Sequence, residues 1–367
     1  MTIPFVALDS QNKLIEAEIM NAFKRFFNDK RYILGAELDA FEQKYAAFHG
    51  LDHCIGVSNG LDALHLALKA LEIGPGDEVI VPANTFIASW LAISYAGATI
   101  VPVEPDRFTY NLDPDLLEAA ISPKTKAIIP VHLYGQACEM AQIMEVALRH
   151  GLYVVEDNAQ AQGALSRGKM TGTFGDINAT SFYPTKNLGA FGDAGALTTQ
   201  NGGLAHKVRV LRNYGSEIKY VNEVIGFNSR MDELQAALLS VKLNHLLTWT
   251  AERRKIADHY NDLLGDISQV ILPGIAEGAT HVYHLYVIRV AERDGLQKHL
   301  DSCGIGTAIH YPIPPHLQKA YQRLGYQKGD FPIAEELAAT SLSLPLFPGM
   351  TEGQVEKVAR SVKDFYA

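Results

Sequence analysis

Short apolar runs and amphipathic segments alternate along the chain from about residue 54 to about residue 230. The apolar runs have the length of buried strands, and the segments between them place apolar side chains on one helical face. Leucines 61, 64, 68 and 71 follow a three-four-three spacing, for example, which predicts a helix after the first run. We predict strands at residues 53–58, 77–82, 98–103, 125–132, 153–157 and 178–184.

Start and stop signals separate these elements. Residues 84–97 predict a helix that ends at Gly97, because glycine accepts the backbone conformation that closes a helix. Asp113 followed by Pro114 predicts an N-cap and the first turn of another helix. Since strands and helices alternate in this order, we predict an α/β fold with a mostly parallel central sheet and helices on both faces.

The pattern changes after about residue 230. Residues 231–264 contain no glycine or proline and predict a long helical stretch, followed by a strand at 281–290 and a helix at 292–304. Near the end of the chain, Thr351 and Gln354 predict a capping box. The side chains that would then share one face of the last helix are Val355, Val358, Val362 and Phe365.

This change predicts two domains. The length of 367 residues is enough for one large domain and one smaller one. We place the boundary in the long helical stretch, with a large domain at residues 1–245 and a small C-terminal α+β domain at residues 246–367.

Composition and charge narrow the range of partners. The net charge is -9 and no run of Lys or Arg interrupts it, which argues against nucleic acid and against an anionic membrane. The apolar stretches are too short to span a bilayer, and the first residues lack a secretory pattern. Cys54, Cys138 and Cys303 are far apart, so we expect a cytoplasmic protein without a disulfide framework or a metal site.

Polar residues follow each predicted strand, and in an open α/β sheet ligands bind beyond these strand ends. Lys186 stands out among them, because it lies between an apolar strand and a glycine-rich turn with no acidic residue beside it. The segments at the strand ends are SNGL (58–61), ANTF (83–86), HLYGQ (132–136), EDNAQ (156–160) and YPTKN (183–187).

These strand ends suggest chemistry that uses pyridoxal phosphate. An amine with a lowered pKa, such as that of Lys186, can bond to the cofactor aldehyde, and Asp157 could hold the proton on the ring nitrogen. Residues 58–60 lead into a helix N-terminus that suits a phosphate, and Phe86 offers an aromatic face. Taken singly, each residue has an ordinary explanation as a cap, a surface charge or a core side chain.

The chain resembles the DegT/DnrJ/EryC1/StrS family of sugar aminotransferases, which have the aspartate-aminotransferase fold (fold type I). The resemblance covers nearly the whole chain, and the matching motifs are specific in combination. They include SNGLDALHLALKAL, GDEVIVPANTFIAS, PVHLYGQACEM, VVEDNAQAQGA, SFYPTKNLGAFGDAGAL, LRNYGS and FNSRMDELQAA. Asn158 departs from the alanine that is commoner beside the family's aspartate, and we expect no change of chemistry from it.

The resemblance implies a role for each matching residue around the cofactor. Lys186 matches the Schiff-base lysine that also moves the proton, and Asp157 matches the partner of the ring nitrogen. Gln160 matches the residue that bonds the ring 3-hydroxyl, and Phe86 matches the ring that stacks on the cofactor. The phosphate would be held by Gly60, Leu61 and Ser181, and by Asn228 acting on the cofactor of a neighbouring subunit. That last role implies a homodimer with shared active sites.

A second resemblance, to the branch that aminates C3 of nucleotide-linked 3-keto-6-deoxyhexoses, rests on residues 212–220 and 310–321. It places Tyr183, His310 and Tyr311 in the sugar pocket and Lys219 near the pyrophosphate. An exposed Lys219 without a role and a structural His310 stay open as alternatives. Arg230 is a candidate for dimer contacts or for the acidic amino donor, and we leave both open.

The implied reaction transfers the amino group of L-glutamate to C3 of a dTDP-3-keto-6-deoxyhexose, leaving 2-oxoglutarate and an amino sugar of the kind used in O-antigen or S-layer glycans. Amination at C4, or of a UDP-linked sugar, is the alternative. A dehydratase is disfavoured because such relatives replace the lysine by histidine, whereas position 186 is lysine. A cofactor-binding regulator is disfavoured because we find no DNA-binding segment. The configuration at C4 and any assembly beyond a dimer are left open.

Overall fold

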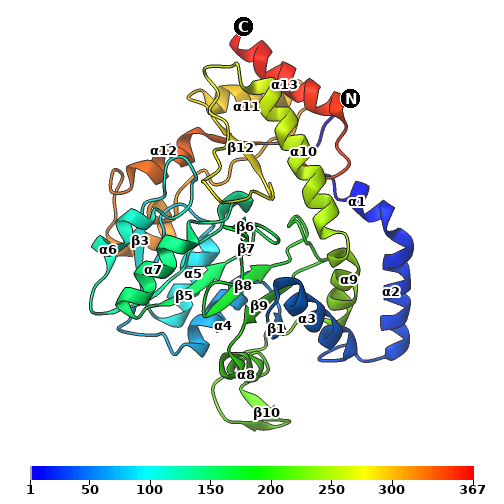
Figure 1. Cartoon of the computed structure of the whole chain (residues 1–367), viewed down its shortest axis with the longest axis vertical. Coiled ribbons are helices and arrows are strands. Elements are labelled where there is room, and N and C mark those ends of the chain that lie inside the picture. Colours follow the sequence, from blue (N-terminus) through cyan, green and yellow to red (C-terminus); the bar gives the residue numbers. More distant parts are fainter. Residues whose placement is uncertain (1) are drawn as a thin grey trace.

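A computed structural model describes residues 2–367 (Figure 1). Seven strands form the central sheet in the order β1-β9-β8-β5-β4-β2-β3. The five strands from β8 to β3 pair in parallel, and β9 pairs antiparallel with both of its neighbours. The strands are β1 (His53–Val57), β2 (Glu78–Pro82), β3 (Thr99–Val103), β4 (Thr125–Ile128), β5 (Tyr153–Asp157), β8 (Ile177–Ser181) and β9 (Gly195–Thr199). The predicted α/β fold is confirmed.

Alternate side chains of each strand enter different hydrophobic clusters, as the two-residue period of a strand requires. Val79 and Val81 pack into the cluster that contains α4, α5 and α8, whereas Ile80 packs with α6 and α7. Helices α3 and α9 contribute a third cluster beside β1 and β9. The covering helices are α3 (Ala36–His49), α4 (Gly60–Ala70), α5 (Ile87–Ala96), α6 (Leu117–Ala120), α7 (Met140–His150), α8 (Gly202–Leu211) and α9 (Glu233–Leu243).

All six predicted strands are present, some of them shorter than predicted. The segment 125–132 ends as a strand at Ile128, and 178–184 ends at Ser181. The helix predicted at 84–97 begins only at Ile87 and closes on Gly97 with a left-handed φ of 84°. Asp113 caps the next helix as predicted, although its first turn is a 3-10 turn (Pro114–Leu116) that continues into α6.

The long helical stretch after residue 230 is divided into α9 and α10 (Leu246–Leu264). At the division, the N–H groups of Asn244 and His245 bond to carbonyls three residues back rather than four. Two consecutive bonds of this kind tighten the turn and end the regular α-helix. The predicted division into residues 1–245 and 246–367 stays a prediction.

A fourth hydrophobic cluster lies around the antiparallel pair of β12 (Tyr286–Arg289) and β13 (Ser341–Leu344). It is packed by α10, α11 (Arg293–Ser302) and α13 (Glu352–Tyr366), and Ile3 also contributes to it. Figure 1 shows α11 and α13 at the top of the molecule, above the central sheet. The predicted helix at 292–304 is confirmed.

The strand predicted at residues 281–290 is correct only for its second half. The first residues bond elsewhere: Val282 N–H donates to Gly135 O at 2.8 Å and Leu285 N–H to Tyr134 O at 3.1 Å. The loop after β4 therefore supplies the acceptors for these two amides, and the strand begins only at Tyr286. This attachment brings part of the C-terminal region close to the carboxyl end of β4.

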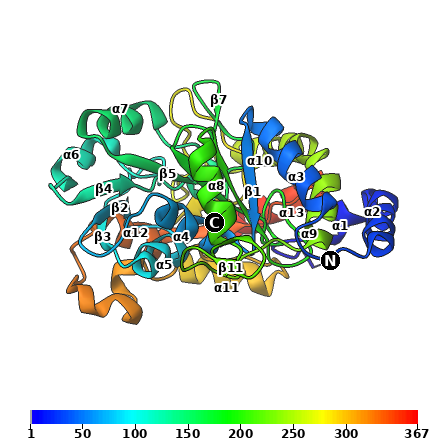
Figure 2. The ribbon, with the colours of Figure 1, turned by 90° about the horizontal axis from the view of Figure 1, so that it is seen from below.

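The remaining elements are not part of the central sheet. Figure 1 shows α1 and α2 along one side and β10 at the bottom, below α8, and Figure 2 shows α8 and β11 from below. Among residues 2–367, no helix combines the length and apolar character needed to cross a membrane. These elements are α1 (Asp9–Leu14), α2 (Glu16–Asp29), β6 (Leu165–Ser166), β7 (Lys169–Met170), β10 (Ser216–Ile218), β11 (Val221–Asn222), α12 (Pro332–Thr340) and 3-10 turns at Leu133–Gly135, Pro315–Leu317 and Lys319–Leu324.

The capping box of α13 gives a first prediction. Thr351 Oγ1 accepts from Gln354 N–H at 3.3 Å, and Gln354 Oε1 accepts from Thr351 N–H at 2.9 Å. We expect Thr351→Ala to lower the free energy of unfolding by about 1 kcal/mol, because one amide of the first turn loses its acceptor. Urea unfolding measures this change. Thr351→Ser keeps the oxygen and should cost less than half as much; an equal cost for both variants would contradict the prediction.

Candidate active site

A cavity of about 480 Å³ opens at the carboxyl ends of the parallel strands. Its wall combines strand-end residues of the central sheet with residues 284, 310 and 311 of the C-terminal region. The predicted site residues that line it are Gly60, Leu61, Phe86, Asp157, Gln160, Ser181, Tyr183, Lys186, His310 and Tyr311. These predicted residues, from five segments of the sequence, thus meet in one place.

Lys186 and Asp157 line this cavity, where burial shifts the pKa of each side chain. Burial lowers the pKa of the Lys186 amine to about 8, although the charge of Asp157 acts in the opposite direction. Burial also raises the pKa of the Asp157 carboxyl, against hydrogen bonds from Ser89 and Ala159 and the charge of Lys186. A substantial fraction of the amine is therefore neutral near physiological pH, which a nucleophile requires.

Asp157 is held in a fixed orientation. Ser89 Oγ, on α5, donates to Oδ2 of Asp157 at 2.8 Å, and Ala159 N–H approaches Oδ1 at 3.2 Å. The hydroxyl of Thr85 lies 3.0 Å from the Ser89 hydroxyl and extends the chain of hydrogen bonds. The backbone of Asp157 is also bonded to the neighbouring strand exit, through Pro130 O at 2.9 Å.

An anion site adjoins this pair at the N-terminus of α4. The amide groups of Gly60 and Leu61 lie in the first turn, where no helical carbonyl can accept them. A Cβ atom at position 60 would lie 2.6 Å from Cβ of Ser181, so only glycine allows the helix to start this close to β8. Asn59 caps the helix by accepting from Asp62 N–H at 2.8 Å. Free amides and the helix dipole favour a phosphate here.

Aromatic and amide groups form the opposite side of the cavity. The rings of Phe86 and Tyr311 lie 5.3 Å apart between centroids. Gln160 Nε2 donates to the Tyr311 hydroxyl at 3.1 Å, and Gln160 Oε1 accepts from Tyr134 N–H at 2.6 Å. His310 Nδ1 lies 2.8 Å from Ser343 Oγ, and burial together with the charge of Lys186 lowers the pKa of His310 to about 4.

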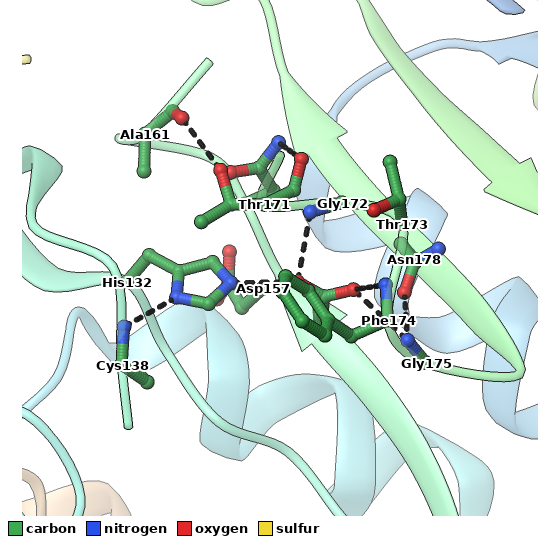
Figure 3. Close-up of polar contacts among 12 residues, drawn as sticks. His132, Cys138, Asp157, Ala161, Thr171, Gly172, Thr173, Phe174, Gly175 and Asn178 are labelled. Atoms are coloured by element: carbon green, nitrogen blue, oxygen red, sulfur yellow. Dashed lines mark hydrogen bonds and ion pairs between the residues drawn. The ribbon is translucent and has the colours of Figure 1, made fainter. Parts of the chain in front are cut away.

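A buried carboxylate on the other face of β5 supports this arrangement (Figure 3). Glu156, next to Asp157, accepts from His132 Nε2 at 2.8 Å and from three amides. Those amides belong to Gly172, Phe174 and Gly175, at 2.8, 2.5 and 2.9 Å. Burial alone would raise the pKa of Glu156, but the donors from His132, Gly175 and Gly172 hold it below the usual range.

His132 completes this buried cluster. Its Nδ1 accepts from Cys138 N–H at 3.0 Å, so the ring proton is on Nε2 and points to Glu156. The cluster joins the exit of β4, the end of β5 and the loop before β8. The sequence analysis did not identify this cluster. Glu156 and Asp157 are adjacent acids in the sequence, and only the alternation of side chains along β5 places them on opposite faces of the strand.

Two predicted residues and one open candidate lie outside the cavity. Asn228 and Lys219 are exposed, and the Lys219 amine lies 5.0 Å from the centroid of the Tyr220 ring. Arg230 is half-buried and donates to Asn213 Oδ1 at 2.9 Å. Their roles, like those of the cavity residues, stay predictions.

The cavity also contains residues that sequence reasoning missed, above all His284 and Asp193. His284 fell within a predicted strand, where no signal marks a cavity residue. Among residues 2–367, no group of three or more His, Cys, Asp or Glu side chains is arranged to hold a metal ion.

These features fit pyridoxal phosphate as the bound group. Lys186 would hold its aldehyde carbon, Asp157 its ring nitrogen, and the first turn of α4 with Ser181 its phosphate. The space that glycine leaves at position 60 and the lowered pKa of Lys186 are the structural observations that support this assignment.

Comparison with known proteins agrees with this assignment. A model of the DegT/DnrJ/EryC1/StrS aminotransferase family matches residues 13–363. The dTDP-3-amino-3,6-dideoxy-alpha-D-galactopyranose transaminase of Aneurinibacillus thermoaerophilus is 50% identical over 363 residues, covering 99% of each chain. The dTDP-3-amino-3,4,6-trideoxy-alpha-D-glucose transaminase of Streptomyces venezuelae is 47% identical over 363 residues, covering 99% of this chain and 96% of the relative.

A solved structure confirms the fold class. The crystal structure of S. venezuelae DesV in complex with a ketimine intermediate superimposes with a TM-score of 0.97 and 47% sequence identity. The match covers 99% of this chain and 98% of that chain.

The lowered pKa of Lys186 gives a second prediction. In cofactor-free protein, the rate at which an acylating reagent modifies Lys186 should rise through a midpoint near pH 8, because only the neutral amine reacts. Pulse labelling followed by peptide mass spectrometry measures this rate. In Asp157→Asn protein the midpoint should shift to lower pH, because a charge that favours the protonated amine is lost. A midpoint near pH 10 would contradict the prediction.

The buried carboxylate gives a third prediction. Glu156→Gln should lower the free energy of unfolding by about 2–4 kcal/mol, because an amide NH₂ group would face donors that now meet an oxygen. Urea unfolding of cofactor-free protein measures this loss. Glu145→Gln, which removes only an exposed pair with Arg149, should cost less than about 1 kcal/mol. An equal loss of unfolding free energy in Glu156→Gln and Glu145→Gln would contradict this prediction.

Proposed function

Because this chain belongs to the DegT/DnrJ/EryC1/StrS aminotransferase family and is a pyridoxal-phosphate-dependent nucleotide-sugar transaminase, we propose that it aminates C3 of a dTDP-3-keto-6-deoxyhexose with L-glutamate as donor. The observation that carries the proposal is the meeting of Lys186 and Asp157 in one cavity with a phosphate-binding helix N-terminus. Relatives that are 47–50% identical over nearly the full length bear the names of dTDP-3-amino-sugar transaminases, which supports the sugar and its position.

Different residues of the cavity would have different roles in such a reaction. When bound, pyridoxal phosphate supplies an aldehyde for covalent attachment and a ring that accepts electrons. Lys186 releases its proton readily, so it can take a proton from the α-carbon of glutamate and return one at C3 of the sugar. Asp157 is fixed by Ser89 and would hold a proton on the ring nitrogen.

The sugar would lie against Tyr183, His310 and Tyr311. Tyr183 is more than half exposed at the mouth of the cavity, whereas Tyr311 is fixed by Gln160. His310 is neutral near physiological pH and can exchange hydrogen bonds with hydroxyl groups. These three side chains therefore offer uncharged polar contacts that suit a hexose.

We also propose a homodimer that shares its active sites and works in the cytoplasm. Asn228 and Lys219 lie outside the cavity of their own chain, on an exposed segment. The same segment exposes the apolar side chains of Ile218, Val221 and Ile225, which a second copy could cover. Sedimentation would test the dimer, and mixing Lys186→Ala with Asn228→Ala protein would test sharing, because mixed dimers should regain activity.

A fourth prediction tests the reaction. Wild-type protein loaded with cofactor and supplied with L-glutamate and the two C4 epimers of dTDP-3-keto-6-deoxyhexose should yield a 3-amino sugar, identified by mass and NMR. A dTDP-4-keto and a UDP-linked sugar serve as competitors, and amination of one of these instead would favour the alternative reaction. Lys186→Ala should lose activity by at least about 10⁴-fold, because no other group supplies the amine.

A further inference from the structure

His284 lies in the cavity wall on a backbone that is fixed from two sides. Val282 N–H and Leu285 N–H bond to the loop after β4, and Asn187 Nδ2, from the residue next to Lys186, donates to Val282 O at 3.0 Å. Gly135 makes the close approach possible, since a Cβ atom there would lie 2.9 Å from the backbone nitrogen of His284. The imidazole therefore has a defined position in the same cavity as Lys186.

The imidazole of His284 lacks the partner that a buried polar group normally has. Its side chain is about nine-tenths buried, and Nδ1 has no hydrogen-bond partner among residues 2–367. No other residue of the described cavity wall has a buried side-chain nitrogen or oxygen left unpaired. Buried polar groups are rarely left unpaired except where a ligand or water completes them.

Two histidines near His284 in the structure, by contrast, have an Nδ1 atom that is paired with a protein group. Nδ1 of His281 accepts from Tyr283 N–H at 2.8 Å, and Nδ1 of His310 lies 2.8 Å from Ser343 Oγ. Both rings are thus held by protein groups, whereas His284 is held by its backbone alone. A ring that is fixed in place but unpaired is suited to a ligand.

The surroundings determine which ligand group it can take. Burial, followed by the charges of Lys186 and Arg253, lowers the pKa of His284 well below its ordinary value, so the ring is neutral. A neutral imidazole offers one donor and one acceptor, which suit a hydroxyl group or a carbonyl oxygen, and it lacks the positive charge that would favour an anionic group.

We propose that His284 is a substrate-binding residue that hydrogen-bonds an oxygen on a carbon next to the one that receives the amino group. The proposal rests on the proposed function, since Lys186 must reach the aminated carbon and His284 shares the cavity wall with it. It makes His284 a determinant of which hydroxyl pattern the enzyme accepts.

The test compares His284→Phe, which keeps a ring of similar size, with wild-type holoenzyme on three sugars. These are the accepted dTDP-3-keto-6-deoxyhexose, its 2-deoxy analogue and its 4-deoxy analogue. We expect kcat/KM of the variant to fall about tenfold on the parent sugar and to stay within about twofold of wild type on one analogue, which then identifies the contacted oxygen. His284→Asn, whose amide reaches the position of Nδ1, should recover part of the loss.

Three further readouts separate binding from a structural effect. Calorimetric affinity for the dTDP-3-amino-sugar product should fall in parallel with kcat/KM, and the half-reaction with glutamate should be unchanged. His49→Phe removes another buried imidazole, one whose Nε2 has no partner and which is not in the cavity wall. Any loss that it causes should be equal on all three sugars.

An equal loss for His284→Phe on all three sugars, no loss at all, or a slower glutamate half-reaction would each overturn the inference. Wild-type protein that aminates no 3-keto sugar would overturn the proposed function and, with it, this inference.

Discussion

The chemistry of this protein depends on burying a lysine amine and a carboxylate in the wall of one cavity. Burial disfavours both charges, and it outweighs the attraction that Asp157 exerts on the proton of Lys186. An exposed pair in water would stay ionised and inert toward a carbonyl carbon. The sheet makes the arrangement possible, because β5 and β8 run parallel and bring their carboxyl ends, and hence these residues, to the same edge.

Two consecutive acids at the end of β5 have opposite roles because a strand alternates its side chains. Asp157 faces the cavity with two donors, whereas Glu156 faces a buried cluster with four. The cluster fixes the loops on either side of β5, and the cavity carboxylate thereby keeps its position without a direct bond to a basic residue. Asp157 thus presents its carboxylate to the cavity, whereas its neighbour Glu156 accepts the hydrogen bonds of the buried cluster.

The sequence predicted much of this arrangement, for physical reasons that differ between elements. The strands and α4 follow from local periodicity, and Lys186 and Asp157 follow from strand ends that a parallel sheet brings together. The attachment of residues 282–285 to Tyr134 and Gly135 was not predictable, because it depends on contacts between distant segments. The break at Asn244 is a local change of hydrogen bonding without a Gly or Pro to mark it in the sequence. His284 was missed because its place in the cavity wall also depends on contacts between distant segments, and Glu156 because a buried acid paired by backbone amides has no local sequence signal.

The cavity of one chain offers little positive charge to the anionic groups of the proposed substrates. Its wall contains one lysine, two aspartates and two histidines whose pKa values are lowered, so it carries little positive charge. The proposed substrates, glutamate and a sugar diphosphate, would both need cations, and the first turn of α4 is already suited to the cofactor phosphate. Lys219 and Arg230 lie outside this cavity, on or beside the exposed segment that also displays apolar side chains. The same surface thus displays positive charge together with exposed apolar area, so the homodimer proposed above would supply both through one interface.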